Sequence, residues 1–302
     1  MTRVLITGAN GLVGSNLKTL LLQNNFKVFT TDLFGNVNFK GDLKDNNFIK
    51  KLPEVDCVIN CAAVQYLSPN MPFFRRKKYF IENNINSLKN LKDKYDGSID
   101  FFIQFGSSMM YEENLSGEYS SNDRFAPSNG IYSESKCEAY RELHKLKSSS
   151  ALIIPSIIAG NGRKGFFSFI TKLIKRFRIV IMPGDCLHVT SVVHVSDVCS
   201  LVLKVLSVRA QGIFNVDSGE KSSISDWVDL ISKKLNMTAL KIKIPINFFK
   251  FLGFITFYRF IAKEQLMILE RPHRLNLHQS KALGWEPING IQKIIDDTID
   301  FK

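Results

Sequence analysis

Hydrophobic and polar positions follow two alternating patterns in the first half of the chain. Short apolar runs, typical of buried strands, occur at residues 4–7, 27–31, 57–61, 101–105 and 151–154. Each run is followed by a turn signal or by apolar spacing of helical period, as in residues 12–22. This alternation predicts an α/β fold in which helices cover a doubly wound parallel sheet.

Beyond about residue 160 the pattern becomes irregular and rich in aromatic residues, as in residues 165–169 and 244–261. We therefore expect a smaller C-terminal lobe. Residues 1–160 and 188–216 are assigned to the sheet domain, and residues 161–187 and 217–302 to the lobe.

The apolar stretch 244–261 is interrupted by Pro245, Lys250 and Arg259, so no transmembrane segment is expected. We rank a core helix pair or a substrate lid first. A surface that touches lipid or another subunit remains the alternative.

The composition is that of an ordinary globular chain of 302 residues with 45% hydrophobic residues, enough for a sizeable core. Its net charge of +12 includes basic runs at residues 75–78 and 175–178. Nucleic-acid binding is one interpretation, but solvated helix faces are favoured, so no nucleic-acid partner is expected. A third interpretation is that the positive field attracts a small anionic substrate.

The five cysteines form no C-x-x-C pair, and the N-terminus does not resemble a signal peptide. Scattered thiols in an odd number suit a reducing compartment. We therefore expect a cytoplasmic protein without a metal site.

A glycine-rich segment joins the first predicted strand to the first predicted helix. Gly8, Gly11 and Gly14 allow a sharp turn and let a pyrophosphate approach backbone N–H groups at the helix N-terminus. Asp32 ends the next strand, where a carboxylate can accept hydrogen bonds from both ribose hydroxyls and would repel a 2′-phosphate. The pattern predicts a dinucleotide site for NAD rather than NADP.

Tyr132 and Lys136 are four residues apart, which places a phenol and an ammonium on one face of a helix. A cation there can lower the pKa of the phenol toward the range of a general base. Ser107 and Ser108 follow the strand 101–105, whose carboxyl end should face the ligand crevice. A hydroxyl at that place can bind a substrate alcohol and relay its proton.

With these motifs the chain resembles the extended short-chain dehydrogenases/reductases, specifically the NAD-dependent epimerase/dehydratase family that acts on nucleotide sugars. The resemblance covers nearly the whole chain and implies a Rossmann-type sheet. By resemblance the cofactor would contact residues along the sheet edge, namely Gly8, Gly11, Leu12, Val13, Gly14, Asp32, Leu33, Asp42, Leu43, Cys61, Ala62, Ala63, Tyr132, Lys136, Pro155 and Ile158.

The resemblance also assigns chemistry. Ser107, four residues before Tyr111, matches the family's proton relay. Tyr132 would take a proton from a sugar hydroxyl, while Lys136 would hold the nicotinamide ribose and lower the pKa of Tyr132. Substrate contacts are expected at Ser107, Ser108, Arg163, Arg271 and Arg274. A homodimer packed through the Tyr132/Lys136 helix is implied as well.

Two departures from the family pattern bear on the substrate. Thr190 stands where many members carry a diphosphate-binding Arg. Ser108-Met109 replaces the acid pair of the 4,6-dehydratases, which disfavours dehydration. The expected activity is therefore that of a nucleotide-sugar 4-epimerase, with a 4-ketoreductase or dehydrogenase and a non-catalytic dinucleotide-binding scaffold as alternatives. His194 and Asp197 are expected to be structural, with Asp197 as a helix cap.

Overall fold

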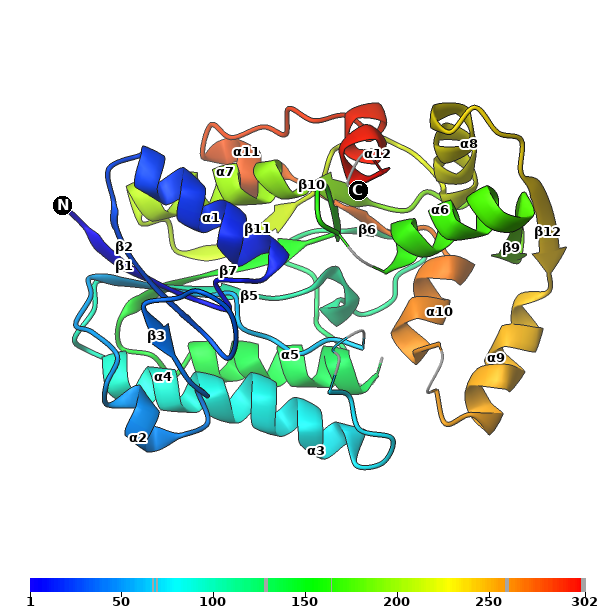
Figure 1. Ribbon diagram of the computed structural model, residues 1–302. Helices are drawn as coiled ribbons and strands as arrows, with labels where there is room; N and C mark the ends of the chain where they lie inside the picture. The colour runs from blue at the N-terminus through cyan, green and yellow to red at the C-terminus, as the bar shows by residue number, and fades with distance from the viewer. Residues whose placement is uncertain (67, 69, 128–129, 164, 259–260, 300–302) are drawn as a thin grey trace.

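A parallel sheet of seven strands forms the centre of the protein in this computed structural model, which describes residues 1–299 except 67, 69, 128–129, 164 and 259–260. The strand order is β11-β7-β5-β4-β1-β2-β3 (Figure 1). The strands are β1 (Arg3–Thr7), β2 (Lys27–Asp32), β3 (Phe39–Lys40), β4 (Cys57–Asn60), β5 (Phe101–Phe105), β7 (Ser149–Pro155) and β11 (Gly212–Val216). The five strands expected from the sequence are all present, and the Rossmann-type doubly wound sheet is confirmed.

The order of the strands reverses at β1, which pairs with β4 on one side and with β2 on the other. Crevices at such switch points, outside the carboxyl ends of the strands, bind ligands in open α/β sheets. The turns after β1, β4 and β5 therefore lie at the edge where a site is expected.

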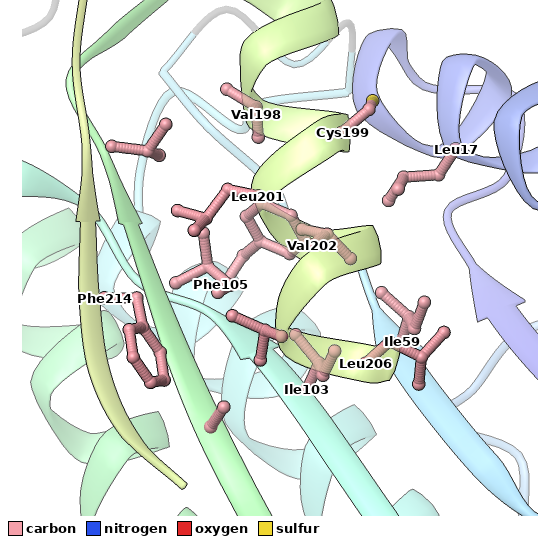
Figure 2. Close-up of a cluster of buried hydrophobic side chains, with 14 of the residues drawn as sticks. Leu17, Ile59, Ile103, Phe105, Val198, Cys199, Leu201, Val202, Leu206 and Phe214 are labelled. Carbon is pink, nitrogen blue, oxygen red and sulfur yellow. The ribbon is translucent and has the colours of Figure 1, made fainter. Parts of the chain in front are cut away.

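Helices cover both faces of the sheet (Figure 1). The upper face carries α1 (Leu12–Gln23) and α7 (Val195–Val208). In Figure 2, Leu201, Val202 and Leu206 of α7 point toward the strand residues Ile103 and Ile59, within a cluster of buried apolar side chains. The lower face carries α2 (Asn46–Ile49), α3 (Arg76–Phe80), the π-helical turn η1 (Ile81–Asn86), α4 (Ser87–Tyr95) and α5 (Ile131–Leu143).

A third apolar cluster lies outside the sheet and is centred on Phe167, Trp227 and Ile294. It is built mainly from α6 (Phe166–Phe177), α8 (Ile224–Lys234), α12 (Ile291–Ile299) and β9 (Ile179–Pro183). Outside the cluster, β12 (Leu240–Ile244) pairs in parallel with β9. The exact division of the chain into sheet domain and lobe remains a prediction.

The remaining elements are short or peripheral. They are η2 (Ser108–Met110), β6 (Glu118–Tyr119), β8 (Ile157–Ala159), β10 (Val192–His194), α9 (Ile246–Ile255), α10 (Lys263–Glu270), β13 (Arg274–Leu275) and α11 (His278–Ala282). Within the described ranges, no helix has the length and apolar character needed to cross a bilayer.

Two expectations were wrong in detail. The stretch 244–261 does not form a buried helix pair, because α9 buries only Gly253 and leaves most of its aromatic side chains exposed; Arg259 and Phe260 lie outside the described residues. Asp197 is not the cap of α7. The His194 side chain caps that helix by accepting from the Ser196 N–H, while Asp197 accepts from the backbone N–H groups of Ile288 and Asn289.

Candidate active site

A pocket open to solvent lies at the carboxyl ends of β1, β4, β5 and β7. Its walls come from segments that are far apart in the sequence, because parallel strands bring their ends to one edge. The lining residues are Val13, Cys61, Ala63, Gln65, Tyr66, Phe105, Gly106, Ser107, Ser108, Met109, Tyr132, Lys136, Pro155, Ser156, Ile157, Ile158, Arg163 and Gln265.

The glycine turn after β1 passes close to the next strand connection. Gly8 has φ +61°, and a Cβ there would lie 2.8 Å from the Ala62 backbone nitrogen. A Cβ at Gly14 would lie 2.3 Å from the Gly8 carbonyl oxygen. Gly11 precedes α1 without a side-chain cap, so the first N–H groups of that helix are directed toward the pocket edge at Val13. This is a cradle that suits a pyrophosphate.

Ser107, Tyr132 and Lys136 all line the same pocket, as the sequence predicted. The Ser107 hydroxyl lies close enough to the Tyr132 phenol to lower its pKa. Lys136 lies on the same face of α5 as Tyr132, with its Nζ 5.9 Å from the centre of the phenol ring. That ammonium is buried and donates to the Phe105 carbonyl oxygen at 3.0 Å.

The pKa of Tyr132 is raised to about 12, mainly by burial, with smaller contributions from three neighbours. The Ser107 side chain and the positive charge of Arg163 lower this pKa, whereas the negative charge of Glu264 raises it. Burial also lowers the pKa of Lys136 to about 8. The role of Lys136 in lowering the pKa of Tyr132 stays a prediction, and the positive charge of Arg163, which the sequence did not assign to that task, acts in the same direction.

Glu264 of α10 is a residue that sequence reasoning missed. It is only 1% exposed, and its carboxylate accepts from the backbone N–H groups of Tyr132 at 3.1 Å and Ser133 at 3.2 Å. The Tyr66 hydroxyl donates to the same carboxylate at 2.9 Å. A carboxylate at this point satisfies free donors at the N-terminus of α5 and interacts favourably with the helix dipole.

The expected substrate residues fall into two groups. Ser107, Ser108 and Arg163 line the pocket together. Arg271 and Arg274 do not line it, and each forms an ion pair: Arg271 with Glu113 at 3.0 Å, and Arg274 with Glu118 at 3.5 Å. Arg271 lines a smaller adjoining pocket that shares Met109 with the main one. Thr190 is buried and lines neither pocket, but it is bridged to His273, which lines the smaller one.

The expected cofactor residues line a path along the strand ends. Val13, Cys61, Ala63, Pro155 and Ile158 reach the pocket wall. Beyond the wall, the Ala62 N–H donates to the Thr7 hydroxyl at 3.2 Å. The partly buried side chain of Leu12 packs against the apolar cluster that includes Val202 and Leu206.

Asp32 lies at the end of β2, where its carboxylate accepts from the backbone N–H groups of Asn10 at 2.9 Å and Leu33 at 2.7 Å. Asp42 accepts from the Lys44 N–H at 2.9 Å. Leu43 differs from the others because its side chain is buried in a second apolar cluster, together with Phe48 and Leu91. Its carbonyl oxygen accepts from the Asn90 side chain.

A comparison with protein-family models decides the relationship. The model described as the NAD dependent epimerase/dehydratase family matches residues 4–217. The chain belongs to this family. The match contains the glycine turn, Asp32, Ser107, Tyr132 and Lys136.

Relatives of this epimerase/dehydratase chain are distant but extend over most of its length. The low-salt glycan biosynthesis protein Agl12 of Haloferax volcanii is 25% identical over 99% of this chain and 97% of that protein. A putative UDP-glucose 4-epimerase of Methanocaldococcus jannaschii is 26% identical over 77% of this chain and 82% of that protein. The solved structure of MoeE5 in complex with UDP-glucuronic acid and NAD has a TM-score of 0.81 at 20% identity, covering 99% and 98% of the two chains.

Beneath the pocket, this member of the epimerase/dehydratase family carries a buried polar chain that crosses three strands. The Thr7 hydroxyl donates to Asn60 Oδ1 at 2.5 Å, and Asn60 Nδ2 donates to Gln104 Oε1 at 2.8 Å. Gln104 Nε2 donates to the Phe105 carbonyl at 3.1 Å, the same oxygen that accepts from Lys136. Buried polar groups that are all hydrogen-bonded hold a single geometry, so this row of hydrogen bonds fixes the position of Lys136.

Sequence reasoning missed both Gln104 and Glu264 as site residues. Gln104 did give a signal, because a lone Gln in the apolar run 101–105 is a buried amide that requires partners. No comparable signal marks Glu264, which lies 132 positions from Tyr132 in the sequence. Within the described residues, no group of three or more His, Cys, Asp or Glu side chains could hold a metal ion.

Proposed function

We propose that the protein is an NAD-dependent 4-epimerase of a nucleotide sugar, which acts through a 4-keto intermediate. The observation that carries the proposal is the composition of the pocket. It gathers Ser107, Tyr132 and Lys136, yet none of its described lining residues is Asp or Glu. A 4,6-dehydratase needs an acid that protonates the leaving hydroxyl, and this pocket has no carboxyl group for that task.

The residues of the pocket edge fit NAD. The glycine turn would hold the pyrophosphate, and the Asp32 carboxylate would accept from the ribose hydroxyls while repelling a 2′-phosphate. Lys136 would hold the nicotinamide ribose. Bound there, NAD would accept a hydride from the substrate and return it. MoeE5, whose fold is similar, was solved with NAD and UDP-glucuronic acid, and this supports the same pairing of ligands here.

The chain's own residues would move the proton. Tyr132, which lines the pocket with Ser107, would remove the proton of the sugar 4-hydroxyl, with Ser107 binding the same oxygen. Lys136 and Arg163 would stabilise the phenolate. Arg163 would also lie near the anionic part of the substrate, because it is the arginine in the described lining of this pocket. An Arg–phosphate contact there would compensate for Thr190.

A direct assay tests the proposal. Purified protein is incubated with UDP-, dTDP- and GDP-sugars, with sugar configuration followed by NMR and NADH by absorbance. We expect interconversion of C4 epimers without net NADH. Tyr132→Phe should lower kcat by about 10² to 10⁴-fold while retaining NAD.

The outcomes separate the alternatives. Stoichiometric NADH formation or consumption would instead indicate a dehydrogenase or ketoreductase. Bound NAD without turnover of any sugar, and no effect of Tyr132→Phe, would favour a scaffold. We also propose, from the family resemblance, a homodimer packed through α5 and a cytoplasmic location.

A further inference from the structure

The outer face of α9 is apolar, which reverses the usual pattern of a surface helix. Phe248, Phe251 and Phe254 are 53%, 62% and 70% exposed, and Ile255 is exposed beside them. Their spacing of three and four residues places them together on one side of the helix. A helix at a protein surface normally turns its apolar side toward the core. Among the described residues, the exposed side of α9 therefore lacks the partner that its chemistry requires.

The apolar surface continues on both sides of α9. Toward the N-terminal side, β12 pairs with β9 so that Ile242 lies opposite Ile181, and both side chains are exposed. Toward the C-terminal side, Phe257 is exposed, and Arg76 donates to its carbonyl and to that of Tyr258.

These contacts bring the segment before α3, with its exposed Phe73 and Phe74, next to the end of α9. We call the whole area the end surface; its members are Phe73, Phe74, Ile181, Leu240, Ile242, Phe248, Phe251, Phe254, Ile255 and Phe257. α9 and β12 form the end of the molecule that lies opposite the N-terminus (Figure 1). Exposed apolar surface of this extent marks an interaction site.

Positive charge surrounds the end surface. The sequence from residue 230 to residue 263 contains no Asp or Glu and seven Lys or Arg. Arg75 and Lys243 are exposed and have no acidic partner among the described residues. The same holds for Lys175 and Arg178, at the end of α6, where the Arg178 carbonyl accepts from the N–H of Leu240.

We propose that the end surface docks on an anionic phospholipid bilayer. α9 has 10 residues, or about 15 Å, so it could lie in the headgroup region but not span a hydrocarbon core of about 30 Å. Phe side chains on one face with Lys and Arg beside them are the pattern of an interfacial helix. The cations attract anionic headgroups while the aromatic rings enter the acyl boundary.

A second copy of the chain fits this surface less well. Protein interfaces are rich in aromatic residues, Met and Arg but poor in Lys. The stretch around α9 supplies aromatic residues as Phe, but six of the seven basic residues between positions 230 and 263 are Lys. Repulsion between two such basic surfaces would also oppose self-association.

The docking would place the proposed active site close to the bilayer. α9 packs on α10, and α10 carries Gln265 of the pocket wall. The inference goes beyond the proposed function and does not depend on it, since the surface is defined without reference to the pocket chemistry.

Flotation of the full-length protein with vesicles tests the docking. Vesicles of phosphatidylcholine with 30% phosphatidylglycerol are compared with pure phosphatidylcholine, each at 0.1 and 0.5 M NaCl. We expect the protein to float with the anionic vesicles at low salt, and at least tenfold less with the neutral vesicles or at high salt. Failure of the wild-type protein to float with anionic vesicles at low salt would overturn the proposal.

Substitutions locate the contact. Phe251→Ser/Phe254→Ser should reduce flotation at least tenfold, and Arg178→Glu/Lys243→Glu should reduce it to a similar degree. The matched control, Leu115→Ser/Ile288→Ser, removes two exposed apolar side chains elsewhere and should float like the wild type. Equal flotation of the Phe251→Ser/Phe254→Ser variant and the wild type would overturn the assignment. The assignment would also be overturned if neither the wild type nor this variant bound vesicles, while light scattering showed a dimer for the wild type and a monomer for the variant.

Discussion

Two charges of opposite sign, those of Arg163 and Glu264, act on the phenol of Tyr132. Burial is the main cause that raises the pKa of this phenol, to about 12 in all, which is too high for a base near neutral pH. Arg163 favours the phenolate and Glu264 opposes it. These two residues belong to different parts of the chain, so they can be changed separately.

Replacing Arg163 should weaken the base. Arg163→Gln removes a cation that stabilises the phenolate, so the pKa of Tyr132 rises further. A base that must be deprotonated then becomes active only at higher pH. We expect the acidic limb of the kcat profile to move up by about one pH unit. Arg163→Lys keeps the charge and should move the limb less; equal movement in both variants would contradict the electrostatic role.

Replacing Glu264 should have the opposite effect. Glu264→Gln keeps the size of the side chain but removes the negative charge that raises the pKa of Tyr132. The pKa therefore falls, and the acidic limb of the kcat profile should move to lower pH. The control is Glu270→Gln on the same helix, because Glu270 pairs with Lys250 at the surface. A profile that moves upward in Glu264→Gln would show that the loss of hydrogen bonds to α5 dominates.

At the scale of elements, the contact between the β1 turn and α1 determines the cofactor cradle. A methyl group at residue 14 would lie 2.3 Å from the Gly8 carbonyl, a backbone atom that cannot rotate away. Gly14→Ala should therefore displace the start of α1 and weaken NAD binding by tenfold or more, as measured by calorimetry. Gly97→Ala is the control, since a Cβ there meets nothing within 4 Å, although φ is +75°. It should lower stability without changing NAD affinity.

The elements around this cradle were predictable from the sequence because their signals are local. A strand buried on both faces is a continuous apolar run, as in β5, and a strand-to-helix turn requires glycine where backbones approach closely. The positions of Ser107, Tyr132 and Lys136 in one pocket followed from these local signals together with the family resemblance.

Contacts between distant elements could not be predicted in this way. Whether Arg271 faces a substrate or pairs with Glu113 depends on how β13 and its neighbours pack, which no short pattern encodes. The same is true of Glu264 at the start of α5. The apolar stretch around α9 was misread because hydrophobicity predicts burial only when a partner surface is present within the chain.

At the scale of the whole molecule, the net charge of +12 should act on an anionic substrate before it reaches the pocket. A positive field raises the local concentration of anions and the rate of association, and salt screens it over a Debye length of about 10 Å at 0.1 M. We expect kcat/KM for the nucleotide sugar to fall several-fold between 0.05 and 0.5 M NaCl, with kcat nearly constant. The salt dependence should be measured by initial rates on the same preparation.

A surface variant separates this long-range effect from contacts inside the pocket. Lys175→Gln/Arg176→Gln removes two exposed charges at the end of α6, outside the pocket lining. Because only the summed field changes, the slope of log kcat/KM against ionic strength should become shallower while kcat stays the same. The wild type and the variant both keep Arg163. If the salt effect came from an ion pair between Arg163 and the substrate, log kcat/KM would therefore fall with ionic strength at the same slope in both proteins. Equal slopes would therefore assign the salt effect to the pocket rather than to the charge of the molecule.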